Sequence, residues 1–159
     1  KMFNVHTLGG LKMMEAVRKS VDETCKRERR PIILVVTILT SMDEKAIKQV
    51  GIQGPVKKRV LQLAELAKKA GLNGVVASPL EVRDIKKKLG KDFIAVTPGI
   101  RMPAPDRFNQ GPDSRPDDQS RIMTPGEAVR AGADYIVVGR PIREAKEPVE
   151  AVRKILEEI

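Results

Sequence analysis

The sequence predicts an α/β fold made of consecutive strand–helix units around a parallel sheet. Short aliphatic runs alternate with longer stretches in which apolar residues recur at helical spacing, and this pair is repeated five times. The motifs that contain glycine and arginine come directly after the aliphatic runs, where the carboxyl ends of parallel strands meet at one edge. This alternation of strands and helices fits both open doubly wound sheets and closed (β/α) barrels.

The expected strands are residues 2–6, 31–39, 74–78, 92–99 and 135–139. The second of them, PIILVVTIL, is nearly all aliphatic, which is typical of a strand covered on both faces. Between 100 and 122 the chain is polar and rich in Pro, Asp, Gly and Arg, and we expect a long loop there.

The expected helices follow the strands, at 11–27, after a cap at Ser41 or Asp43, and at 55–71, 79–90, 124–132 and 148–159. Gly71 and Gly90 provide stop signals for two of them. Thr124 stands three residues before Glu127, with Pro125 between them, which is the pattern of a capping box.

Composition narrows the classes of function. The 159 residues suit a single domain, 1–159, with a real hydrophobic core. A net charge of +9 permits binding of anionic ligands. The basic residues are scattered over helix faces, however, and only four aromatic residues are present to stack bases, so binding of nucleic acid is disfavoured.

The lone Cys25 and lone His6 exclude a CxxC or multi-histidine metal site. The sequence contains no membrane-spanning run and no visible signal peptide, and we expect a cytoplasmic protein.

Two arginines follow the last two expected strands. Arg101 ends the motif TPGIR, and Arg140 follows Gly139 in VGRPI. A small residue at a strand end can present backbone N–H groups to an anion, and an adjacent guanidinium adds a charged contact. In barrels the loops after the last two strands often bind phosphate. Gln119 lies between these motifs and could close over a ligand, whereas the glycine-rich nucleotide-binding patterns of open sheets are absent.

At these residues the sequence resembles the orotidine 5′-monophosphate decarboxylase family, bacterial type. The motifs that carry the resemblance are VHTLGG, VTILTSM, VTPGIR and DDQSRIMTPGEAVRAGADYIVVGRPI, in that order along the chain. The resemblance implies a (β/α)₈ TIM barrel that acts as a decarboxylase without a cofactor, a carboxy-lyase of pyrimidine (UMP) biosynthesis, usually as a homodimer.

The resemblance also implies the substrate-binding residues. Thr40 matches a residue that contacts the pyrimidine ring, and Arg101 matches a ligand-binding arginine. Gln119 matches the glutamine that bridges base and phosphate, and Gly139 with Arg140 matches the pair that binds the phosphate of the nucleotide (OMP or UMP).

The catalytic part of the family pattern is absent from this chain. The family's Asp-Lys-Asp array depends on a D-x-K-x-x-D motif after the third barrel strand, and the nearest match, residues 84–86, lies in a helical pattern. We therefore expect an incomplete barrel of about the last five units, strands 4 to 8, with the first three units absent and no catalytic residue in this chain. Such a fragment is expected to be inactive, and unstable because its outer strands lack partners.

Two other classes stay open at this point. Another phosphate-binding barrel enzyme, of the hexulose-phosphate synthase or pentose-phosphate epimerase type, could share the glycine–arginine pair at a strand end. A basic, non-catalytic binding module would fit the net charge and the absent catalytic array.

Overall fold

The computed structural model describes residues 1–102 and 121–159. Its strands form one sheet, in which every pairing is parallel and the order is β1-β2-β3-β4-β5. The strands are β1 (Met2–His6), β2 (Ile32–Val36), β3 (Gly74–Val76), β4 (Ile94–Thr97) and β5 (Tyr135–Ile136). The expected parallel sheet is therefore confirmed, with shorter strands than the aliphatic runs suggested.

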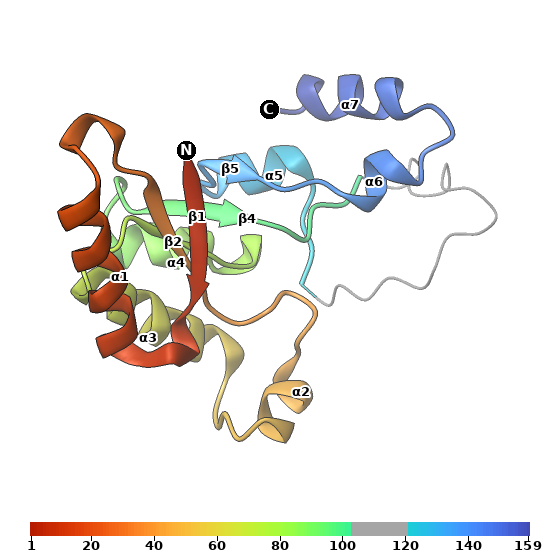
Figure 1. Ribbon diagram of the computed structural model, residues 1–159. Helices are drawn as coiled ribbons and strands as arrows, with labels where there is room; N and C mark the ends of the chain where they lie inside the picture. The colour runs from red at the N-terminus through yellow and green to blue at the C-terminus, as the bar shows by residue number, and fades with distance from the viewer. Residues whose placement is uncertain (103–120) are drawn as a thin grey trace.

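The strand order favours a barrel over an open doubly wound sheet. A doubly wound sheet reverses direction at a switch point, so some consecutive strands are not neighbours. Here each strand pairs with the next strand along the chain. The sheet is also strongly twisted, and β1 runs steeply across the direction of β4 in Figure 1. Consecutive parallel pairing with such a twist is the arrangement of units in a (β/α) barrel.

The helices begin and end close to the signals in the sequence. They are α1 (Gly10–Thr24), α2 (Glu44–Gln49), α3 (Val56–Lys69), α4 (Pro79–Leu89), α5 (Pro125–Arg130), α6 (Arg140–Arg143) and α7 (Pro148–Glu157), with short 3₁₀ turns at Thr7–Gly9 and Arg27–Arg29. Asp43 caps α2 by accepting a bond from the backbone N of Ala46. The capping box of α5 is confirmed, since Thr124 and Glu127 each accept a bond from the other's backbone N–H.

The hydrophobic core lies between one face of the sheet and the helices α1, α3 and α4. Its sheet side consists of Ile33, Val35 and Val75, which are fully buried. Its helix side is formed by Met14 of α1, by Val60, Ala64 and Ala67 of α3, and by Ile85 of α4. These helices lie together on one side of the sheet in Figure 1.

The outer strands are much more open than the inner strands. Met2 in β1 and Tyr135 in β5 are 43% and 46% exposed, whereas Leu34 and Val96, which lie on the same face by register, are 2% and 6% exposed. The last strand, expected at 135–139, ends at Ile136, although Val137 N still donates to Thr97 O at 2.9 Å. Strand β5 pairs only with β4 among the described residues, so a single ladder holds it.

Asn73 and Gly74 join three strands at the amino end of β3. The side-chain Oδ1 of Asn73 accepts from Ile33 N at 2.8 Å, and its backbone carbonyl accepts from Ile94 N at 3.0 Å. A Cβ atom built on Gly74 would lie 2.2 Å from Ile94 O, so the close approach of β3 to β4 requires glycine.

Among the described residues, none of the helices is both long and apolar enough to cross a bilayer.

Candidate active site at the carboxyl edge

The carboxyl edge of the sheet, where β2, β3 and β4 end, holds a pocket of about 140 Å³. Because all strands are parallel, the residues that follow them gather at this edge. The pocket is lined by Val36, Ile38, Leu39, Thr40, Ser41, Val76, Ala77 and Pro98. Its walls are mostly apolar, and Thr40 and Ser41 contribute the hydroxyl groups, a composition typical of a small-molecule site.

Backbone bonds beyond the strands hold the pocket walls together. Thr37 N and Thr37 Oγ1 both donate to Val76 O, at 3.1 and 3.0 Å, which extends the ladder between β2 and β3. Ala77 N donates to Val96 O at 3.1 Å, which extends the ladder between β3 and β4. Thr40, which follows Ile38 and Leu39 in the pocket wall, is only 7% exposed. The predicted pyrimidine-contacting residue thus lies in the wall of a preformed pocket.

Arg101 follows β4 at the same edge. Its backbone N donates to Met123 O at 2.9 Å, and Met123 N donates to Gly99 O at 3.3 Å. Gly99 has a φ of +81°, which a residue with a side chain rarely adopts, so glycine permits the turn after Pro98. The Arg101 guanidinium is buried, and its Nη1 donates to Ile100 O at 2.8 Å.

Gly139 and Arg140 follow β5, the neighbour of β4. The Gly139 carbonyl accepts from Ile142 N and Arg143 N, both at 3.0 Å, and so begins the short helix α6. Gly139 has a φ of −110°, and a Cβ there would meet nothing within 4 Å, so neither a left-handed backbone nor a clash requires glycine in this structure. Arg140 is half-buried.

The sheet therefore places four of the predicted residues, Thr40, Arg101, Gly139 and Arg140, at one edge. Thr97 of β4 pairs with Ile136 of β5, and each arginine follows its strand after the same number of residues. Only Thr40 among them lines the pocket of about 140 Å³. Gln119 lies outside the described residues.

A buried ion pair beside the pocket was not predicted. Arg121 Nη1 lies 2.6 Å from Glu81 Oε1, and the side chains are 10% and 3% exposed. The spacing of Ser78 and Glu81 is that of a capping box, which would assign the glutamate to the start of α4. Ser78 does cap α4, by accepting from Leu80 N, but Glu81 contacts Arg121 instead. Burial raises the pKa of the Glu81 carboxyl, and the positive charge of Arg121 opposes that rise.

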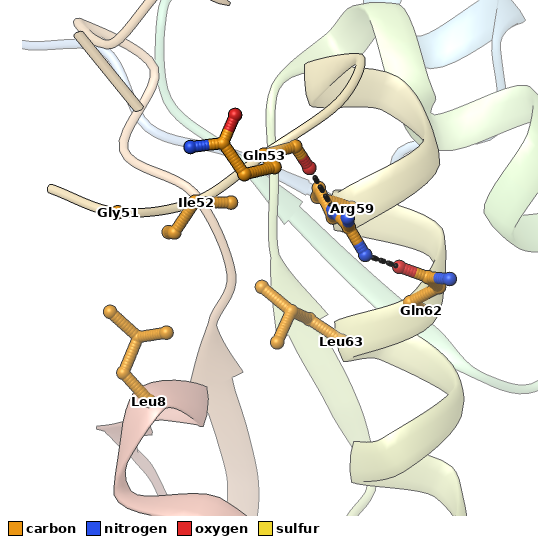
Figure 2. A pocket seen from close by; sticks show the side chains of 7 residues that line it. All are labelled: Leu8, Gly51, Ile52, Gln53, Arg59, Gln62 and Leu63. Atoms are coloured by element: carbon orange, nitrogen blue, oxygen red, sulfur yellow. Dashed lines mark hydrogen bonds between the residues drawn. The ribbon is translucent and has the colours of Figure 1, made fainter. Parts of the chain in front are cut away.

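A larger pocket, of about 340 Å³, lies away from the predicted residues, between the turn after β1 and the start of α3. Figure 2 shows its lining, in which Arg59 contacts the backbone carbonyl of Gln53 and the side chain of Gln62. The guanidinium is thus already bonded to protein acceptors, and the apolar side chains of Leu8, Ile52 and Leu63 form the rest of the wall. The carboxyl-edge pocket is the better candidate site, because Thr40 lines it and Arg101 and Arg140 follow their strands at the same edge.

Comparison with known proteins decides the family. The sequence profile described as Orotidine 5'-phosphate decarboxylase / HUMPS family matches residues 1–155. The chain belongs to this family. The resemblance predicted from the motifs is confirmed.

Relatives at about half identity span the entire chain. The chain is 52% identical over 159 residues to orotidine 5'-phosphate decarboxylase of Geotalea uraniireducens, and 50% identical to that of Geobacter sulfurreducens. In both cases all of this chain is covered, against 62% and 63% of the relative. The chain therefore spans a little over three fifths of the length of the curated relatives it matches.

The fold agrees with solved members of the family. The crystal structure of orotidine 5'-phosphate decarboxylase from Lactobacillus acidophilus matches with a TM-score of 0.74 at 35% identity, covering 98% of this chain and 61% of that one. The parallel sheet with its helices is thus part of a TIM-barrel fold, as predicted.

Proposed function

We propose that this chain is the nucleotide-binding part of an orotidine 5′-monophosphate decarboxylase, which forms UMP. The observation that carries the proposal is the family match over residues 1–155, in a chain whose candidate ligand residues follow neighbouring parallel strands at one edge. A phosphorylated pyrimidine has a charged end and a flat, largely apolar end. The two arginines suit the first, and the pocket around Thr40 suits the second.

In this proposal each predicted residue has one role. Arg140 and the backbone at Gly139 bind the phosphate, and Arg101 contributes a second positive charge at the same edge. Thr40 contacts the pyrimidine ring, and Gln119 bridges base and phosphate. Phosphate contacts far from the reacting carbon can still assist the reaction, because binding energy gained there positions the ring.

The proposed chemistry needs no cofactor. The bond between C6 of the orotate ring and its carboxylate breaks, CO₂ leaves, and the electron pair stays on C6. A lysine ammonium then donates a proton to C6, which gives UMP. The charge that develops on the ring is stabilised by preorganised groups, so electrostatics is the main catalytic contribution.

The catalytic lysine and aspartates belong, in this proposal, to barrel units upstream of residue 1. Residues 1–159 then supply strands 4 to 8 of the barrel as a single domain. The exposed outer strands and the relatives' greater length support this assignment. It follows that residues 1–159 alone should show no decarboxylase activity.

From the family we further propose a homodimer in the cytoplasm. Size-exclusion chromatography and cell fractionation would test these two points.

The test compares two arginines of α6 in the whole gene product that contains residues 1–159. Arg140→Ala should lower kcat/KM for decarboxylation by at least about tenfold, because a hydrogen bond to a charged group contributes about 1.5–3 kcal/mol. Arg143→Ala is the matched control, since Arg143 is exposed on the same helix, and it should stay within about twofold.

Three results would contradict the proposal. They are an intact gene product that leaves orotidine 5′-monophosphate unchanged, equal effects of the two substitutions, and tighter binding of ribulose 5-phosphate than of UMP. The last result would assign the chain to a sugar-phosphate enzyme with the same barrel.

A further inference from the structure

The buried pair of Glu81 and Arg121 connects segments that are distant in sequence. Besides its contact with Glu81, Arg121 donates from Nη2 to two carbonyls of the segment after β2, at 3.2 Å to Ile38 O and 2.8 Å to Leu39 O. Ser78 Oγ donates to the backbone carbonyl of Arg121 at 3.3 Å. One guanidinium thus holds together the exit of β2, the start of α4 and the segment that leads to α5.

These segments are the ones that carry the candidate ligand residues. Ile38 and Leu39 line the carboxyl-edge pocket and directly precede Thr40. Two residues after Arg121, Met123 accepts the backbone N–H of Arg101. The ion pair therefore lies behind the pocket wall, between the segment of Thr40 and the segment of Arg101.

Stability alone does not account for a charged pair at this position. Moving two charges out of water costs several kcal/mol, and well-packed apolar residues of similar volume often stabilise a protein equally well. Within the described residues, Glu81 Oε2 and Arg121 Nε are buried and lack a hydrogen-bond partner, so the pair is not fully compensated. What an arginine adds is geometry, because its planar fork can bind a carboxylate and two carbonyls at fixed angles.

We propose that Glu81 and Arg121 are positioning residues of the nucleotide site, which fix the Thr40 segment relative to the strand exit that carries Arg101. This inference rests on the proposed function. Neither residue touches the nucleotide. They act through the backbone of Ile38 and Leu39 and through the segment from Arg121 to Met123.

The test replaces the pair while keeping its volume, in the whole gene product. The double variant Glu81→Met/Arg121→Met should keep a cooperative thermal transition and bind UMP at least tenfold more weakly, as measured by calorimetry. Arg121→Lys should also weaken UMP binding, because an ammonium cannot reach the carboxylate and both carbonyls in that geometry. Glu81→Gln retains an acceptor for Arg121 and should restore UMP binding to within threefold.

The matched control is Lys88→Gln on the same helix. Lys88 forms an exposed ion pair with Glu65 of α3. This variant should bind UMP within twofold of the parent. A double variant or an Arg121→Lys variant that folds and binds UMP like the parent would overturn the inference. So would failure of all three variants of the pair to fold, because the pair would then be a requirement of the fold and not of the site.

Amide hydrogen exchange separates this inference from the proposed function. Loss of the pair should speed exchange in residues 38–42 and 121–124, whether or not UMP binds. A parent that fails to bind UMP but shows this coupling would contradict the proposed function only. A parent that binds UMP, with unchanged exchange and affinity in the double variant, would contradict the inference only.

Discussion

The inner strands β2 to β4 and the outer strands β1 and β5 differ sharply in burial. Leu34 and Val35 of β2 are 2% and 0% exposed, whereas Met2 of β1 and Tyr135 of β5 are 43% and 46% exposed. The inner strands have a neighbour on each side and helices over one face. The outer strands have one neighbour each among the described residues.

This difference divides the candidate site. Thr40 and Arg101 follow inner strands, and networks of backbone bonds hold their segments. Gly139 and Arg140 follow β5, which is two residues long and rests on one ladder. We therefore expect the part of the site at Thr40 and Arg101 to be preformed, and the part at Gly139 and Arg140 to depend on what packs beside β5.

The largest expected effect comes from a substitution in an inner strand. In Gly74→Ala the new Cβ would meet the backbone of Ile94, which cannot move without disturbing β4. Overpacking of this kind costs about 3 kcal/mol or more when backbone must shift. Chemical denaturation of residues 1–159 measures the loss in the free energy of unfolding, because β1 is an outer strand there.

The matched control lies in the same row of the sheet. Asn4 of β1 pairs with Leu34, which pairs with Gly74, and Asn4 is exposed. Asn4→Ala should change the free energy of unfolding by no more than about 0.5 kcal/mol. If both substitutions cost the same, the distinction between inner and outer strands fails.

Core truncation sharpens the comparison with a second pair of register neighbours, Ile33 and Phe3. Ile33 is fully buried, and Ile33→Ala should cost about 2–5 kcal/mol. Phe3 is 38% exposed, and Phe3→Ala should cost less than about 2 kcal/mol despite the larger side chain. Thermal and urea unfolding of residues 1–159 would measure both, and a greater cost at Phe3 would contradict the account.

A smaller effect is expected at Asn73, whose side chain adds a hydrogen bond between β2 and the start of β3. Asn73→Ala leaves the Ile33 N–H without its acceptor and should cost about 1–3 kcal/mol. Asn73→Asp keeps an oxygen at that position and should recover most of the loss. Equal destabilisation by the two variants would show that the bond to Ile33 is not the cause.

The smallest expected effect concerns pH. Burial raises the pKa of Glu81 above its ordinary value of 4.5, so between these two values the folded protein binds more protons than the unfolded chain. The contribution of this group to the free energy of unfolding therefore decreases as the pH rises through that window, by at most about 1.4 kcal/mol per pH unit.

Glu81→Gln cannot titrate and should flatten this part of the pH profile, measured by urea unfolding at pH values from 4.5 upward. Glu65→Gln, in the more exposed ion pair with Lys88, is the control and should leave the slope unchanged. A slope that survives in the Glu81 variant would assign it to another group.

Much of the fold could be predicted because its signals are local. The aliphatic run at 31–39 indicated a buried strand, and the spacing of Thr124 and Glu127 indicated a helix start that the structure confirms. The last strand was predicted too long, since the apolar residues Val137 and Val138 show β propensity, while pairing depends on a neighbour.

The site was predictable only in part, because some of its residues meet only through contacts between distant segments. Parallel strands bring their carboxyl ends to one edge, so Thr40, Arg101 and Arg140 could be placed there from sequence alone. The pair of Glu81 and Arg121 could not, because the partners are separated by 40 positions and meet only through the folded sheet. The sequence DDQSR places Arg121 beside a candidate residue, which is the one local signal for it.

The most direct test of the central claim is a crystal structure of the whole gene product with UMP. The account predicts that the phosphate oxygens lie within hydrogen-bond distance of the Arg140 guanidinium and of backbone N–H groups near Gly139, with the pyrimidine ring against Thr40. A nucleotide bound at another edge of the sheet, or a phosphate with no contact to Arg140, would contradict it.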